Sequence, residues 1–133
     1  MDQNELKLTY GEGRYKIYIL ALITCEGISI TITGGEKPHV GGTVLSVPRK
    51  SGAGEHMSCD TWICPVPGHK DTEIAVKVAE TVCRGTGQTV GVIAGIHINK
   101  AQQRELEILV DNAVMATRLL VDQIKRIVEK EDA

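Results

Sequence analysis

The strictest pattern in the chain is the alternation ISITIT at residues 28–33, in which isoleucine and hydroxyl-bearing side chains take turns. Successive side chains of a β-strand point to opposite faces of a sheet, so this segment predicts a strand with one apolar and one polar face. Residues 5–10 and 14–25 alternate in the same way, and short glycine-containing breaks separate the three runs. We therefore predict an antiparallel meander of three strands with one face toward solvent.

Three more strands are predicted downstream of the meander. The apolar run at residues 40–47 precedes Pro48, which we expect to end the strand because proline cannot donate a hydrogen bond to a neighbouring strand. A polar, glycine-containing loop at residues 49–58 leads to a second run at residues 59–66. Residues 89–98 are almost continuously apolar, which is typical of a central strand.

Two helices are predicted in the second half of the chain. Apolar residues recur at helical spacing between residues 74 and 82, with Asp71 or Thr72 as the cap and glycines 85 and 87 as the stop. A longer helix follows Asn99, its expected N-cap, and continues to about residue 130. At roughly 30 residues it would measure about 45 Å, long enough for its far end to support a second subunit. The predicted class is α+β, with a mostly antiparallel sheet covered by two helices, the C-terminal one long.

Composition and charge exclude several classes of function. The 133 residues are 42% hydrophobic and 24% charged, as in an ordinary globular domain, and we treat residues 1–133 as a single domain. The formal net charge of −2 offers no general attraction to nucleic acid or to an anionic membrane. We find neither a secretory leader nor an apolar run of the roughly 20 residues that span a bilayer. We therefore expect a cytoplasmic protein without a membrane or nucleic-acid partner.

Three segments far apart in the sequence each place a histidine beside glycine at the boundary of a predicted element. The first is TGGEKPHVGG at residues 33–42, which contains His39; the others are PGHKD at residues 67–71 and AGIHIN at residues 94–99. Binding residues concentrate at such boundaries. We therefore predict that His39, His69 and His97 meet at one site.

The second segment has the chemistry of an anion site. His69 and Lys70 precede a helix predicted to begin near Asp71, and the first N–H groups of a helix attract negative charge. Arg49 and Lys50, at the end of the first segment's strand, could reach the same anion. A phosphate or a polar ring system is therefore a plausible ligand for the convergent segments.

A transition metal is an alternative ligand for the three histidines. No two of them have the i,i+3 or i,i+4 spacing that would preform a pair on a helix, so metal binding is not indicated by spacing. No serine or cysteine lies in the context of a known catalytic nucleophile. Nearby carboxylates that could orient an imidazole are Glu36, Asp60 and Asp71.

Together, the three motifs resemble the small LpdD-like family, the gallate decarboxylase D subunit and its relatives, which are described as prenylated-flavin chaperones. The resemblance covers roughly residues 10–125. It rests on GG-x-x-PH-x-G before a strand ending in Pro-Arg, on GHKD opening a helix, and on AGIH before the last helix. The positions that carry the first motif are Gly34, Gly35, Pro38, His39, Gly41, Pro48 and Arg49.

The resemblance implies a fold like that of the proteasome assembly chaperones, in a domain that commonly forms homodimers. It also implies a ligand, prenylated FMN or a related flavin such as FMN, that is held for delivery to a UbiD-type decarboxylase rather than turned over. The implied flavin-binding positions are Gly34, Gly35, Pro38, His39, Gly41, Arg49, His69, Lys70 and His97. Aromatic side chains that could stack on the flavin are few, namely Trp62, Tyr10, Tyr15 and Tyr18, and a tryptophan in the middle of a strand is more often a core residue.

Two other functions fit the same residues. The histidine site could bind a metal and carry out hydrolytic or isomerising chemistry, which would make the protein an enzyme. Alternatively, the long helix and the sheet edge could hold protein partners, with the glycines serving only as turns. The resemblance favours the first hypothesis, a non-enzymatic accessory protein that binds flavin.

Overall fold

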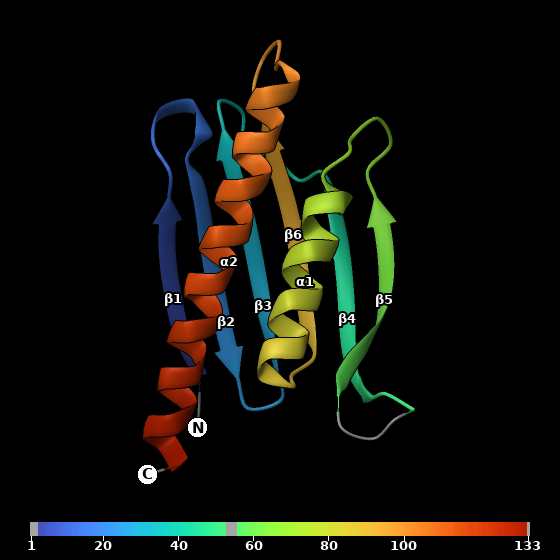
Figure 1. Cartoon of the computed structure of the whole chain (residues 1–133), viewed down its shortest axis with the longest axis vertical. Coiled ribbons are helices and arrows are strands. Elements are labelled where there is room, and N and C mark those ends of the chain that lie inside the picture. Colours follow the sequence, from blue (N-terminus) through green and yellow to red (C-terminus); the bar gives the residue numbers. More distant parts are fainter. Residues whose placement is uncertain (1–2, 53–55, 133) are drawn as a thin grey trace.

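The computed structural model describes residues 3–52 and 56–132, which form one six-stranded sheet with two helices on one face (Figure 1). The strands follow the order β1-β2-β3-β6-β4-β5, in which β3 and β6 run parallel and the other neighbours antiparallel. The elements are β1 (Gln3–Tyr10), η1 (Gly13–Tyr15), β2 (Ile17–Thr24), β3 (Gly27–Gly35), β4 (Gly42–Lys50), β5 (Met57–Pro65), α1 (Thr72–Thr86), β6 (Val90–His97) and α2 (Gln103–Asp132). The predicted α+β class, with a mostly antiparallel sheet and a long C-terminal helix, is confirmed.

The alternation in the sequence fixes which face of the sheet the helices cover. Ile28, Ile30 and Ile32 of β3 are almost fully buried, as is the matching set in β2 that begins at Ile17. α1 packs over β4, β5 and β6, and α2 packs over β1 and β2. The opposite face of the sheet carries no helix among the described residues, and we call it the open face. It bears the hydroxyl-rich set of β3 and several exposed apolar side chains from other strands.

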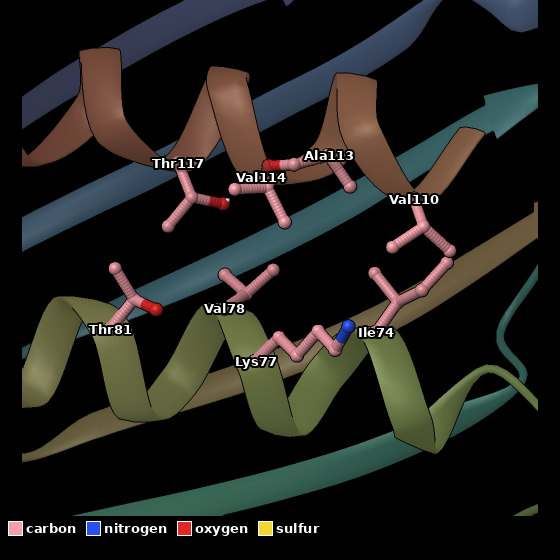
Figure 2. A pocket seen from close by; sticks show the side chains of 8 residues that line it. All are labelled: Ile74, Lys77, Val78, Thr81, Val110, Ala113, Val114 and Thr117. Carbon is pink, nitrogen blue, oxygen red and sulfur yellow. Dashed lines mark hydrogen bonds between the residues drawn. The ribbon is translucent and has the colours of Figure 1, made fainter. Parts of the chain in front are cut away.

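The two helices also pack against each other along a narrow seam (Figure 2). Ile74 and Val78 of α1 face Val110 and Ala113 of α2 across this seam. The remaining space has a free volume of about 10 Å³, which is barely enough for one water molecule. The seam is therefore packed core rather than a ligand site.

Of the strand boundaries that differ from the prediction, two have a clear physical reason. The second strand begins at Ile17 rather than Arg14, because residues 13–15 form the short 3-10 helix η1, with the Tyr15 N–H bonded to the Glu12 carbonyl oxygen. β4 continues through Pro48 to Lys50. Its pairing with β6 ends at Ser46, so Pro48 lies where β5 is the remaining neighbour and the missing N–H is tolerated. The predicted loop 49–58 is correspondingly shorter, and residues 53–55 of it lie outside the described residues.

The caps of the helices also differ in part. Gly87 ends α1 as predicted, with a left-handed backbone (φ 70°) and its N–H bonded to the Cys83 carbonyl oxygen. α2 begins at Gln103, so Asn99 is not its N-cap. The Glu105 carboxylate accepts a hydrogen bond from the Gln102 N–H at 3.1 Å, the return contact of a capping box displaced by three residues.

Candidate functional site

Both helices begin at the end of the sheet where β6 ends (Figure 1). The three motif histidines lie together there, His39 and His69 in the links before β4 and α1, and His97 as the last residue of β6. The centre of the His39 ring is 4.6 Å from that of His69 and 6.4 Å from that of His97. The prediction that the three segments meet is confirmed. Their role in binding stays a prediction at this point.

Close backbone packing holds His39 against β6. The His39 N–H bonds to the Gly95 carbonyl oxygen at 3.4 Å, and the Gly41 N–H bonds to the Ala94 carbonyl oxygen at 2.8 Å. A side chain on Gly95 would overlap the His39 backbone, so this contact requires glycine. The link between β3 and β4 thus crosses the end of β6 at van der Waals distance.

Asp71 joins the cluster and is its most buried member, with 7% of its surface exposed. Its Oδ1 accepts a hydrogen bond from the Ile96 N–H at 2.8 Å, while its Oδ2 lies 3.0 Å from His39 Nε2 and 3.8 Å from His69 Nδ1. Asp71 does occupy the N-cap position of α1, but its side chain makes no capping bond. The sequence pattern indicated a cap or an orienting carboxylate; the structure shows a carboxylate that reaches β6 and two histidines.

The hydrogen bonds of His39 show what its Nε2 must carry. Its Nδ1 lies 2.9 Å from the Lys37 carbonyl oxygen, which can only accept, so Nδ1 bears a hydrogen. Its Nε2 faces the Asp71 carboxylate, which is also an acceptor when ionised. A second proton or a metal ion at Nε2 satisfies both oxygens. Metal-binding histidines commonly donate their other ring N–H to a backbone carbonyl in this way.

Among residues 3–52 and 56–132, one cluster has side-chain atoms close enough to share a metal ion. His39, His69 and Asp71 each offer a ligand atom, and these atoms lie within 4.8 Å of one another. His97 is not part of this set, and its Nε2 lies 3.3 Å from the side-chain oxygen of Asn99. The histidine triad considered from the sequence is therefore replaced by two histidines and an aspartate.

A pocket with a volume of about 370 Å³ opens beside the cluster, between the first turns of α1 and α2, within the range of small-molecule sites. The cluster forms its polar end, and Lys70 and Lys77 add two cations to the lining beside the carboxylate of Glu73. Ile74, Leu106 and Leu109 give it an apolar wall. The site can therefore hold a ligand that has an anionic group and an apolar part.

The remaining residues of the first predicted motif lie close to the cluster but have structural contacts. Gly35 takes a left-handed backbone conformation (φ 74°) against the His97 carbonyl, and Gly34 packs against the Lys16 carbonyl oxygen. Gly41 leaves space that the Asp71 carboxylate fills. Pro38 is exposed.

The expectation that Arg49 and Lys50 reach the same anion is wrong. Arg49 lies at the opposite end of β4 from the cluster, next to the β4–β5 turn, and its Nε donates to Asp60 Oδ1 at 2.8 Å. At about 3.3 Å per strand residue, β4 carries Arg49 more than 20 Å from Gly42. Trp62, expected in the core, is 58% exposed on the open face and does not line the pocket.

No helix in the described ranges combines the length and the hydropathy needed to cross a membrane.

Comparisons with known proteins agree with the motifs. A family model for the prenylated flavin chaperone LpdD-like domain matches residues 11–125. A search of curated proteins gives no match. Among solved structures, the chain is similar to a subunit of a chaperone complex for yeast 20S proteasome assembly, with a TM-score of 0.62 and 13% sequence identity over 95% of this chain and 98% of the other. The structural likeness confirms the expected fold, and at this identity it indicates the fold alone.

Proposed function

The chain belongs to the family of prenylated flavin chaperone LpdD-like domains, and from this premise we propose that it binds prenylated FMN or a related flavin in the pocket beside the histidine cluster. We propose further that it delivers the bound flavin to a UbiD-type decarboxylase without turning it over. The observation that carries the proposal is the composition of the pocket. It combines two lysines, the imidazoles, the carboxylates of Asp71 and Glu73, and an apolar wall in one space of about 370 Å³.

The groups around the pocket fit the parts of a prenylated flavin nucleotide. Lys70 and Lys77 can pair with its phosphate. The imidazoles of His39 and His69 are inclined to each other by 38°. They offer polar ring surfaces against which the isoalloxazine ring system of the flavin could pack, in place of larger aromatic rings. Leu106 and Leu109 can cover the added apolar ring. When bound, the flavin itself would supply the chemistry of the partner decarboxylase, and this chain would bind and orient it.

The test is retention of flavin by the purified protein. We would incubate the wild type with FMN or with prenylated FMN, separate unbound flavin by gel filtration, and record the visible spectrum of the protein peak. Colour with prenylated FMN that is lost in His39→Ala and kept in His56→Ala is the expected result, because His56 is an exposed histidine outside the pocket. A colourless wild-type peak with both flavins would contradict flavin binding and favour the hypothesis that the protein holds only protein partners.

Delivery needs its own experiment, because binding alone does not make a carrier. The loaded protein would be mixed with an apo decarboxylase of the UbiD type, and the flavin in each protein measured after separation. Transfer faster than the uptake of free flavin would support delivery, and equal rates would contradict it. We place this exchange in the cytoplasm; the four cysteines are unpaired, as is usual in a reducing compartment.

A second candidate function, favoured by the geometry of His39, is the binding of a divalent transition metal. His39, His69 and Asp71 would hold the ion, with the Lys37 carbonyl oxygen fixing the His39 tautomer. Metal analysis of the purified protein, with Asp71→Asn as the test and the exposed Asp60→Asn as the control, would decide it. Stoichiometric metal without flavin would favour a metal-dependent enzyme. Metal present together with flavin would make the ion a part of the carrier site.

We propose a homodimer that forms through the open face. Leu20, Leu45, Ile93 and Trp62 expose apolar surface there, and six strands of eight or nine residues present about 700–800 Å², the area that each partner buries in a standard interface. Leu45→Glu should shift the molar mass measured by light scattering to that of a monomer. Ile63→Glu is the control, because Ile63 is 54% exposed but lies on the helix side of β5. A wild-type monomer would contradict the dimer.

A further inference from the structure

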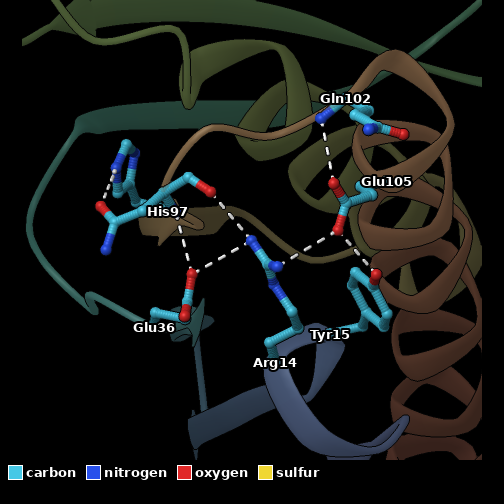
Figure 3. A network of polar contacts seen from close by, with 7 residues as sticks. Arg14, Tyr15, Glu36, His97, Gln102 and Glu105 are labelled. Carbon is cyan, nitrogen blue, oxygen red and sulfur yellow. Dashed lines mark hydrogen bonds and ion pairs between the residues drawn. The ribbon is translucent and has the colours of Figure 1, made fainter.

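Arg14 joins three segments around the pocket although it lies outside every motif (Figure 3). From the short helix η1, its guanidinium lies 3.2 Å from the Glu36 carboxylate and 3.5 Å from the Glu105 carboxylate. It also donates a hydrogen bond to the Asn99 carbonyl oxygen at 2.9 Å. Its contacts therefore reach the β3–β4 link, the β6–α2 link and the first turn of α2.

The ion pair between Arg14 and Glu36 holds both backbone polar groups of Asn99. Arg14 donates to its carbonyl oxygen, and Glu36 Oε1 accepts from its N–H at 2.9 Å. The next residue, Lys100, has a positive φ of 52°, a conformation that is uncommon outside glycine. Hydrogen bonds thus hold the link between β6 and α2 at Asn99, immediately before the unfavourable backbone angle of Lys100.

The same bonds determine where two of the motif histidines lie. The N–H groups of Glu36 and Lys37 both donate to the His97 carbonyl oxygen, at 2.8 and 3.1 Å. The Lys37 carbonyl oxygen faces His39 Nδ1. Movement of Glu36 would therefore shift His97 and His39 together.

On its other side, Arg14 reaches the helix that forms the apolar wall of the pocket. Glu105 lies in the first turn of α2, next to Leu106, and is buried. The Tyr15 hydroxyl donates to the Glu105 carboxylate at 2.7 Å, which lowers the pKa of Glu105 and raises the pKa of Tyr15. The nearby guanidinium also lowers the pKa of Glu105. An ionised Glu105 therefore keeps the start of α2 bonded to η1.

We infer that Arg14 is a positioning residue, which through Glu36 and Glu105 holds His97, His39 and the first turn of α2 in the binding-competent arrangement before the ligand arrives. The inference rests on the proposed function for its effect on affinity. Its effect on the ligand-free protein is independent of that function.

The experiment compares Arg14→Gln and Arg14→Lys with the wild type in two measurements. The control is Lys7→Gln, which removes an ion-paired cation from β1, outside the pocket. The first measurement is amide hydrogen exchange at Glu36, Lys37 and Asn99 without ligand. The second is the dissociation constant for prenylated FMN at 10 °C, after circular dichroism has shown that each variant is folded at that temperature.

We expect Arg14→Gln to accelerate exchange at the three amides and to weaken binding about 10-fold to 100-fold, the loss that follows when a residue orienting ligand-contacting side chains is replaced. Arg14→Lys should recover part of the affinity, because lysine keeps the charge but cannot bond both carboxylates in a fixed geometry. Unchanged exchange would overturn the inference, and so would accelerated exchange with unchanged affinity, which would make the network purely structural. If the wild type binds no flavin, the proposed function fails, while the exchange measurement still decides whether Arg14 holds these segments.

Discussion

Replacing Gly95 with alanine should weaken ligand binding while leaving a folded protein. Gly95 lies in β6 where the β3–β4 link crosses, and an added Cβ would overlap the carbonyl group of His39. The obstacle is backbone rather than a flexible side chain, so the His39 segment has to move by about 1 Å or more. In enzyme active sites a displacement of this size can cost about 100-fold in rate, which shows how steeply a geometry-dependent interaction falls off. We therefore expect affinity for the flavin to fall at least 10-fold.

The cost in stability follows from the contacts at the crossing. Overpacking of a well-packed site costs about 1–3 kcal/mol. The hydrogen bonds from the N–H groups of His39 and Gly41 to β6 are at risk, each worth about 1 kcal/mol. For a domain of this size, 1 kcal/mol corresponds to roughly 3–5 °C in the unfolding midpoint. Gly95→Ala should thus lower Tm by roughly 5–15 °C.

The matched control is Gly91→Ala in the same strand and on the same face. A Cβ at Gly91 would meet no atom within 4 Å, so Tm should stay the same or rise by a few degrees. The assay is thermal unfolding by circular dichroism together with flavin retention after gel filtration. If Gly95→Ala retained flavin like Gly91→Ala, the idea that the crossing positions His39 for binding would be refuted.

Three further outcomes are expected. Arg49→Ala should leave flavin retention unchanged. It should lower the free energy of unfolding, measured by chemical denaturation, by at most about 1 kcal/mol, because it removes only an exposed ion pair. Loss of flavin retention would show that Arg49 does take part in binding. The pKa of Glu105 lies below its ordinary value of 4.5. The stabilisation that its ionised carboxylate gives to the folded state is therefore complete above pH 4.5 and is lost as the pH falls through the lowered pKa. The Tm difference between wild type and Glu105→Gln should therefore be constant near neutral pH and shrink below about pH 4.5, whereas a constant difference down to pH 3 would contradict the bond with Tyr15. Finally, Cys25 and Cys64 are exposed, so a thiol reagent at pH 8 should label two thiols rapidly in the native protein and four after unfolding.

The sequence patterns predict the strands and their faces because a period of two is a local property. Ile28, Ile30 and Ile32 are buried as expected, and the meander follows from the short turns between its strands. The insertion of β6 between β3 and β4 depends on pairing between residues 44 to 62 positions apart. No local pattern contains that information.

The histidine cluster could be predicted because each histidine lies at an element boundary, and boundaries at the same end of a sheet converge. The prediction for Arg49 rests on its place at the end of the first segment's strand, but β4 (Gly42–Lys50) carries that residue to the far end of the sheet. Arg14 has no sequence signal, because its partners are 22 to 91 residues away and include a backbone carbonyl. Only the folded structure makes such contacts visible.

Asp71 shows why the site and the fold cannot be separated here. One of its oxygens accepts a hydrogen bond from the N–H of Ile96, the next-to-last residue of the central strand β6. This bond gives the backbone N–H the partner that it needs away from water. The other oxygen is thereby aimed at His39 and His69 and remains available to a proton or a cation. Because the carboxylate is fixed by a backbone bond rather than by the ligand, the cluster is preorganised, which reduces the cost of binding. The same bond explains why glycine is needed at position 41, where a side chain would displace the carboxylate from both roles.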